Sequence, residues 1–169
     1  MSGLGTSRRP TRPFEAPLFD RLMDAEPERE HDRPSSPAES LALLRRSVHR
    51  DVEALLNARR PWRSLPSGLD ALRVSPVQYG MPDFTAGAFN ERRQRERLCS
   101  EIEETIRRFE PRLEQVQVRL THEVSLLHPT LQLRIDAVLL AHLTADPIVF
   151  DTTIDTTTAD VTLNPLYGP

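Results

Sequence analysis

The change from helix to sheet is encoded in residues 108–120, which read Arg-Phe-Glu-Pro-Arg-Leu-Glu-Gln-Val-Gln-Val-Arg-Leu. Pro111 fixes its own φ angle and disfavours a helical conformation at Glu110, so it ends the helix before it. From Leu113 onward apolar and polar side chains alternate, which predicts a half-buried strand with one irregularity at its start. Glu110 and Arg112 therefore project from a stiff bend. An internal ion pair between them is the favoured interpretation, and a pair that docks a partner is the alternative.

A first amphipathic helix is predicted well before this bend. Ser36 is a capping residue, Pro37 occupies the first helical position and Glu39 the third, which is a helix-start signal. The apolar stripe that follows indicates about six turns, ended by Pro61. Its members are Leu41, Leu44, Val48, Val52, Leu55 and Leu56.

A second helix is predicted from about Phe89 to Phe109. Its apolar stripe is formed by Leu98, Ile102, Ile106 and Phe109. Residues 91–112 also hold seven arginines and six glutamates, which is typical of a solvated face laced with salt bridges. The arginine-rich stretch Glu91–Arg97 is therefore interpreted as a solvated helix start and not as a phosphate-binding face. The connection at 61–89 is expected to pack on the core, with a short helix near Leu69–Leu72.

Downstream of the bend, the pattern predicts an antiparallel meander. A second strand is predicted from Leu131 to Leu139. Near its end the side chains are apolar on both faces of the strand, which predicts a central position in the sheet. Asp146-Pro147 is expected to break the chain before a strand at Ile148–Ile154, and a last short strand covers Ala159–Leu163. The fold class is α+β, with two main helices packed on one face of a sheet of three or four antiparallel strands.

The composition of residues 1–36 predicts a largely disordered arm. Within it, a short amphipathic motif at 17–24 places Leu18, Phe19, Leu22 and Met23 on one face of a brief helix. This face is expected either to dock on the parent domain or to enter a groove of a partner. The expected organisation is this arm, a single domain at 37–163 and a tail at 164–169.

The composition excludes several classes of chemistry. The 169 residues carry 22 basic and 25 acidic side chains, a formal charge of −3, which gives no overall basic field for nucleic acid. Every basic residue is arginine, which excludes lysine-based catalysis. The single cysteine, Cys99, favours a reducing compartment and is expected to be a small buried or half-buried residue rather than a nucleophile. Neither a secretory signal nor a membrane-spanning run is recognisable.

The sequence offers no site for a metal, a cofactor or a catalytic reaction. No two of the five histidines are three or four residues apart, so a metal site is not expected. Glycine-rich nucleotide motifs are missing. Carboxylates are plentiful, but with only nine aromatic residues a sugar-binding cleft is poorly supplied, and no catalytic pair stands out. We expect a protein that is not an enzyme, with a peptidoglycan-active, lysozyme-like hydrolase as the alternative.

Five short motifs, in order, resemble the TssE family of type VI secretion baseplate wedge subunits, which is related to a small wedge protein of contractile phage tails. They are Leu18-Phe-Asp-Arg-Leu22, the stretch from Ser47 to Asn57, Tyr79-Gly-Met-Pro-Asp83, Arg108-Phe-Glu-Pro-Arg-Leu113 and Phe150-Asp-Thr152. Met81 and Gln78 depart from the family pattern, which has Leu and Asn there.

The resemblance implies a structural, cytoplasmic protein of the baseplate. It implies the wedge subunits TssF and TssG as partners, TssK as the link from the assembly to the membrane complex, and the sheath proteins TssB and TssC. It also implies that Glu110, Pro111 and Arg112 act in baseplate and sheath assembly, with further contacts at Leu18, Phe19, Leu22, Tyr79, Pro82 and Asp83. An exposed sheet edge is a compatible means of recruiting sheath strands.

Overall fold

The computed structural model describes residues 18–22, 36–61, 68–84, 91–121, 130–141 and 144–166. The chain divides into two compact units, residues 1–47 and 48–169, and the division falls inside helix α2 (Pro37–Asn57). Helix α1 (Leu18–Leu22) belongs to the first unit. The rest of the predicted arm before Ser36 lies outside the described residues.

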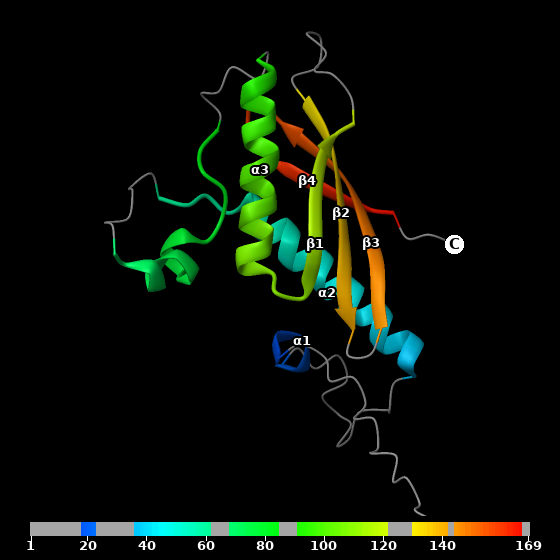
Figure 1. The fold of residues 1–169 in the computed structure, drawn as a ribbon. Coiled ribbons are helices and arrows are strands. Elements are labelled where there is room, and N and C mark those ends of the chain that lie inside the picture. The colour runs from blue at the N-terminus through cyan, green and yellow to red at the C-terminus, as the bar shows by residue number, and fades with distance from the viewer. Residues whose placement is uncertain are drawn as a thin grey trace, which may run out of the picture. The chain divides into compact units, whose positions relative to one another are not determined.

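The second unit contains the end of α2, two short 3₁₀ helices, helix α3 and a four-stranded sheet (Figure 1). The elements after α2 are η1 (Asp70–Val74), η2 (Pro76–Gln78), α3 (Arg92–Phe109), β1 (Leu113–Leu120), β2 (Thr130–Ala141), β3 (Thr144–Asp155) and β4 (Val161–Pro165). The strands are ordered β1-β2-β3-β4 and every neighbouring pair is antiparallel. The predicted α+β fold, with β2 in a central position, is confirmed.

The start of α2 is the predicted capping box. The Ser36 backbone N–H donates to the Glu39 carboxylate at 2.7 Å, and the Glu39 N–H donates to the Ser36 hydroxyl at 3.2 Å. The helix ends at Asn57, earlier than the predicted end at Pro61. The reason is that Ala58 and Arg60 form backbone hydrogen bonds with Met81 instead of continuing the helix.

The predicted irregularity at the start of β1 is a bulge. The pairing of β1 with β2 shifts between Glu114 and Gln117, and Gln115 has a φ of 52°. A bulge of this kind bends the strand and increases its twist.

Pro147 does not break the chain as expected, because β3 runs through it. Pro147 pairs with Val138 of β2, and Val149, two residues on, accepts the Leu166 N–H on the opposite side of the strand. Backbone groups two residues apart point the same way, so the Pro147 nitrogen faces away from β2 and lies beyond the pairing of β3 with β4. No ladder hydrogen bond is lost there, and this is where a strand tolerates proline.

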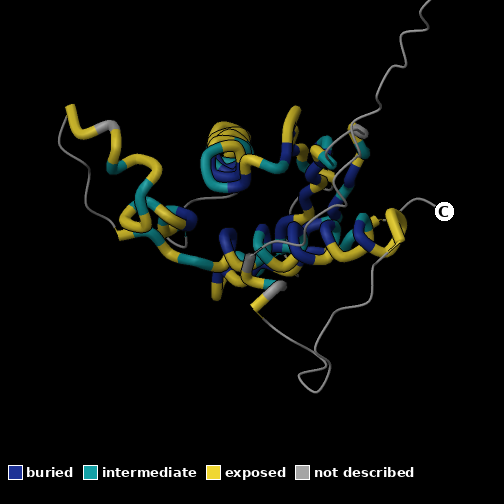
Figure 2. Tube along the Cα trace, turned by 90° about the horizontal axis from the view of Figure 1, so that it is seen from below, coloured by how far each residue is buried: buried dark blue, intermediate teal, exposed yellow. Residues whose placement is uncertain are grey.

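One face of the sheet forms the core, with both helices contributing to it. Alternate positions of the strands are buried, as are one side of α3 and the inner positions of α2, as Figure 2 shows by colour. In the second unit these include Val48, Val52, Leu55, Leu56, Leu98, Ile102, Ile106, Leu131, Leu133, Ile135, Leu139, Phe150 and Ile154. None of the helices among the described residues is long and apolar enough to cross a membrane.

The connection at 68–84 differs from its prediction. A short helix forms where it was expected, as η1, but Leu69, Val74 and Val77 are 49%, 66% and 47% exposed. Two brief 3₁₀ turns close on local hydrogen bonds and carry no continuous apolar stripe toward the core. Of the described apolar residues there, only Met81 is fully buried.

Candidate partner-binding site

The bend between α3 and β1 is held by a three-residue ion network. The Arg112 Nε donates to Glu110 Oε1 at 2.5 Å, and Nη2 donates both to the second Glu110 oxygen and to Asp51 Oδ2, the latter at 2.7 Å. Asp51 lies on α2, so Arg112 connects the C-terminal half of that helix to the start of β1. Such fork-shaped contacts fix the direction of a guanidinium.

The network places Glu110 inside the protein and Arg112 partly outside. The Glu110 side chain is 5% exposed and that of Arg112 is 26% exposed. The hydrogen bonds that Arg112 donates to Glu110, with a further one to Asp51, raise the pKa of Arg112, so the guanidinium stays charged. The geometry is that of the internal ion pair predicted from the sequence. Pro111, between them, is exposed.

Asp51 was missed as a member of this site. It lies within the stretch Ser47–Asn57 that carries the family resemblance, but no local pattern distinguishes it from the other acids of the helix. Its role depends on the packing of α2 against the bend, which is a contact between residues 61 positions apart.

Tyr79 joins the same site from the connection at 68–84. Its ring packs edge-on against Phe109, the last residue of α3, with centroids 5.4 Å apart. Partial burial raises the pKa of Tyr79, and the negative charges of Asp51 and Glu110 raise it further. Two motifs that are thirty residues apart in the sequence therefore meet at one place.

Gly80 explains how this loop approaches α2 so closely. Its φ is +100°, and a Cβ atom there would lie 2.5 Å from the carbonyl oxygen of Ala58. The neighbouring Met81 N–H donates to that same oxygen at 2.9 Å. Glycine is required by both the conformation and the space. Beyond it, Pro82 is half-buried and Asp83 is exposed.

The other predicted contacts belong to α1. Phe19 and Leu22 are 57% and 74% exposed, and the side chain of Leu18 is outside the described residues. These residues belong to the first unit.

Side chains of α2 close the outer edge of β4. Asn57 receives the Val161 N–H at 2.9 Å and donates to the Val161 carbonyl at 2.8 Å. Glu53 accepts the Leu163 N–H, and the His49 ring bonds the Leu163 carbonyl at 2.9 Å. The three side chains are spaced by four residues and so follow one face of the helix. Pro165, the next outward position, has no N–H to offer.

Side chains of α3 cover part of the opposite edge in the same way. Glu103 accepts the Val118 N–H at 2.9 Å, and Arg107 donates to the Val116 carbonyl at 2.5 Å. Glu103 and Arg107 also pair with each other at 3.4 Å. The expectation that the sheet leaves its edges exposed is therefore wrong at Val116, Val118, Val161 and Leu163. At these positions, polar side chains of the helices form hydrogen bonds with the backbone N–H and C=O groups that an incoming strand would need for pairing.

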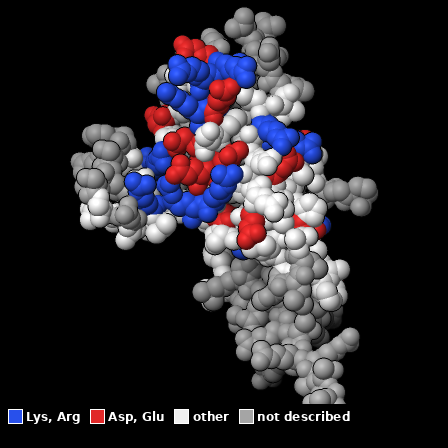
Figure 3. Space-filling model, viewed as in Figure 1, with Lys and Arg blue, Asp and Glu red and all other residues white. Residues whose placement is uncertain are grey.

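The remaining charges of α3 form the predicted salt-bridged surface. Figure 3 shows basic and acidic side chains interleaved over this helix. Ion pairs four residues apart join Arg92 to Glu96 and Arg108 to Glu104. Cys99 is half-buried as expected, and burial raises the pKa of its thiol, which opposes a nucleophilic role.

Among the described residues, no group of three or more His, Cys, Asp or Glu side chains is arranged to hold a metal ion. The site thus consists of a bend held by an internal ion network beside a sheet whose edges are partly covered by helical side chains. The match to the family model for baseplate wedge protein gp25 covers residues 42–143, more than half of the chain, and the chain belongs to this family. The family includes TssE, so the resemblance seen in the motifs is confirmed. No curated protein and no solved structure gave a significant match.

This membership defines the role at a coarse level. The protein is a structural component of a baseplate, and it interacts with other baseplate subunits. The matched region contains the complete ion network, Tyr79 and the first two strands.

Proposed function

We propose that this chain is the TssE-type wedge subunit of a type VI secretion baseplate. In this role it lies in the cytoplasm, contacts TssF and TssG, connects through the assembly to TssK at the inner-membrane complex, and supports formation of the TssB–TssC sheath. The five motifs support the proposal because they resemble TssE over nearly the whole chain. Family membership supports its coarser part.

The observation that carries the proposal is the fixed position of Arg112. Glu110 and Asp51 hold its guanidinium on two sides, and about a quarter of its side chain remains exposed. A charged group that is already oriented loses little freedom on binding, so it suits a specific contact with a partner. Tyr79, next to the network and 37% exposed, adds an aromatic surface of the kind enriched at interfaces.

In this arrangement the members of the motif have different roles. Glu110 is buried and positions Arg112 without touching a partner. Pro111 fixes the bend, and Arg112 with Tyr79 forms the contact surface. The exposed Asp83 and the apolar residues Phe19 and Leu22 of α1 are proposed as additional contacts.

Complementation tests the proposal directly. A strain that lacks this gene and carries fluorescent TssB should form no extended sheaths, and the wild-type chain should restore them. The tagged chain should also co-purify with TssF and TssG. Normal sheath assembly without the chain would contradict the proposed function.

We also propose that the protein has no peptidoglycan hydrolase activity. The missing carboxylate constellation in the sequence motivates this proposal. A zymogram should show no clearing above background. Clearing that a single Asp or Glu substitution abolishes would favour the lysozyme-like alternative.

A further inference from the structure

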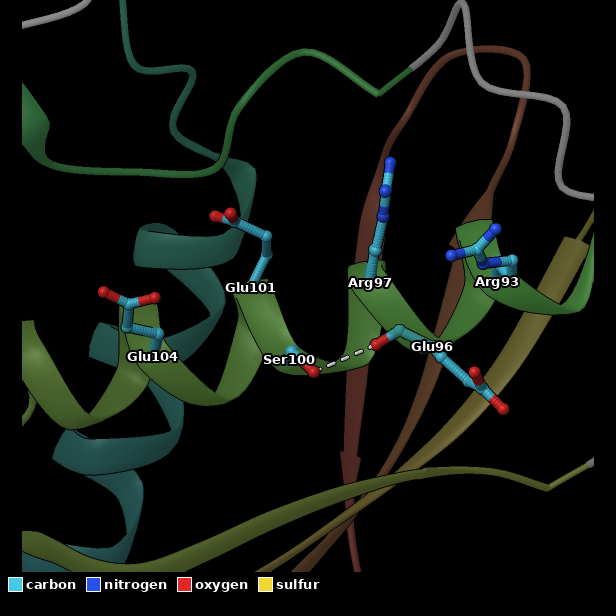
Figure 4. Close-up of a pocket in the computed structure, with 6 residues that line it drawn as sticks. All are labelled: Arg93, Glu96, Arg97, Ser100, Glu101 and Glu104. Carbon is cyan, nitrogen blue, oxygen red and sulfur yellow. Dashed lines mark hydrogen bonds between the residues drawn. The ribbon is translucent and has the colours of Figure 1, made fainter.

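A shallow groove lies along the solvent side of α3. It has a volume of about 460 Å³ and is lined by Arg93, Glu96, Arg97, Ser100, Glu101 and Glu104. Figure 4 shows Arg93, Arg97 and Glu101 projecting from the same side of the helix, whereas Glu96 points away from them. Arg93 and Arg97 are exposed and lie one helical turn apart.

The acidic residues of the groove are neutralised by arginines that do not line it. Glu96 bonds Arg92 at 2.7 Å, Glu101 bonds Arg60 at 3.0 Å, and Glu104 pairs with Arg108. These three acids therefore do not balance the charge of the groove's own arginines.

Arg93 and Arg97 keep their charge available. Within the part of the chain that the structure describes, neither guanidinium has a hydrogen bond or ion pair. Ser100, one turn further along the groove, donates its hydroxyl to the Glu96 backbone carbonyl. The groove is thus left with two uncompensated positive charges whose spacing is set by the helix.

We propose that this groove binds an acidic segment of another baseplate subunit, through carboxylates that pair with Arg93 and Arg97. Two acidic residues on one face of a partner helix, or two positions apart on a partner strand, have a spacing of about 6–7 Å and match the two arginines. This inference rests on the proposed function, because it requires that the chain assembles with wedge partners.

A protein partner fits the groove better than a nucleic acid. The groove offers two arginines, and its three acids, Glu96, Glu101 and Glu104, are each paired with an arginine that does not line it. A phosphate backbone presents a continuous run of negative charges and requires a longer row of cations, whereas a short acidic segment needs only the two guanidiniums. Recognition of the partner therefore depends on the pairing of opposite charges over a short segment.

The test compares two variants that remove the same charge. Arg93→Ala/Arg97→Ala removes both groove arginines, and Arg46→Ala/Arg119→Ala removes two exposed arginines from α2 and β1 as a matched control. Purified TssF and TssG, produced together, are the probe, and their affinity is measured at low and high salt. Thermal unfolding of each variant confirms folding.

We expect the groove variant to bind about tenfold more weakly at low salt than wild type, with the control close to wild type. Arg93→Glu/Arg97→Glu should bind more weakly still, since it repels the acidic segment. High salt should narrow the difference between wild type and groove variant, because ions screen exposed charges.

Three outcomes overturn the proposal. If wild type and groove variant bind TssF–TssG equally, the groove is not the contact, although the proposed function survives. If a 20-base-pair duplex DNA binds wild type and loses affinity for the groove variant while TssF–TssG binding is unchanged, the arginines recognise phosphate. If wild type does not bind TssF–TssG at all, both proposals fail.

Discussion

Asn57 forms two hydrogen bonds with the backbone of Val161, so that an α-helical side chain takes the position of a neighbouring strand. The amide of asparagine has a donor and an acceptor side by side, as a peptide group does. His49 and Glu53 extend this mimicry to Leu163. The edge of β4 is therefore paired within the chain, which protects it from unwanted strand addition.

Asn57→Ala should open this edge. We expect a loss of about 1–2 kcal/mol in the free energy of unfolding, because the two backbone groups of Val161 lose their partners. We also expect self-association that increases with concentration, measured by sedimentation velocity. Asn164→Ala on the same strand is the control, because no side-chain bond of Asn164 is found in the described structure. Equal behaviour of the two variants would disprove the guarding role.

The ion network predicts non-additive effects of substitution. Arg112→Ala leaves the buried Glu110 carboxylate without its main partner, and Glu110→Ala removes the main partner of Arg112. Each should lower the free energy of unfolding by about 2–4 kcal/mol in urea denaturation. The double variant should lose clearly less than the sum, since no buried charge is left unpaired. Additive losses would mean that the three charges do not act as one network.

The same variants separate stability from assembly. Asp51→Ala weakens the network but leaves the Glu-Pro-Arg motif intact. If Arg112 contacts a partner, the Glu110→Ala/Arg112→Ala double variant should fail to support sheath formation in cells. Asp51→Ala should still support sheath formation at a melting temperature comparable to that of the double variant. Sheath formation by the double variant at wild-type level would show that the motif serves only the fold.

How far the sequence predicts this structure depends on the range of the contacts. Periodicity and local signals were enough for both helices, the capping box at Ser36, the bulge in β1 and the bend at Pro111. They failed at Pro147, because tolerance of proline in a strand depends on which neighbour its nitrogen faces.

Long-range polar contacts were the other failure. A spacing of four residues relates His49, Glu53 and Asn57, but the pattern alone does not show that a strand edge more than 100 residues away is their partner. Asp51 was missed for the same reason. The apolar residues of 68–84 suggested burial, and only the packing shows that most of those described are exposed.

Tyr79 predicts a loss of stability at alkaline pH. Its pKa is raised in the folded state by burial and by the nearby Asp51 and Glu110 charges. As the pH rises, Tyr79 therefore loses its proton in the unfolded chain before it does so in the folded protein, at about pH 10. The contribution of neutral Tyr79 to stability is fully present below that pH and is lost as the pH rises further.

Tyr79→Phe should reduce the alkaline loss, measured as the urea midpoint between pH 8 and pH 11. Because burial also raises the pKa of the Cys99 thiol, wild-type and variant are compared in a Cys99→Ala background. An unchanged pH profile in Tyr79→Phe would show that Tyr79 ionises alike in the folded and unfolded states.

The two glycines with positive φ angles give a matched pair that tests the close approach of the loop to α2. Gly80 and Gly68 have φ angles of +100° and +92°, so alanine is strained at both. A Cβ at Gly80 would also meet the backbone of Ala58 at 2.5 Å, whereas a Cβ at Gly68 meets nothing within 4 Å. Gly68→Ala should therefore cost about 1 kcal/mol, and Gly80→Ala should cost at least about 3 kcal/mol.

Gly80→Ala should also displace Tyr79 from Phe109, because the loop cannot move away from Ala58 without breaking the Met81 bond that holds it. The near-ultraviolet circular dichroism, to which Tyr79 contributes, should change in Gly80→Ala and stay as in wild type in Gly68→Ala. Since TssF–TssG binding is proposed to use Tyr79, it should weaken only in Gly80→Ala. Equal stabilities and equal spectra for the two variants would mean that the contact with Ala58 does not hold this part of the site in place.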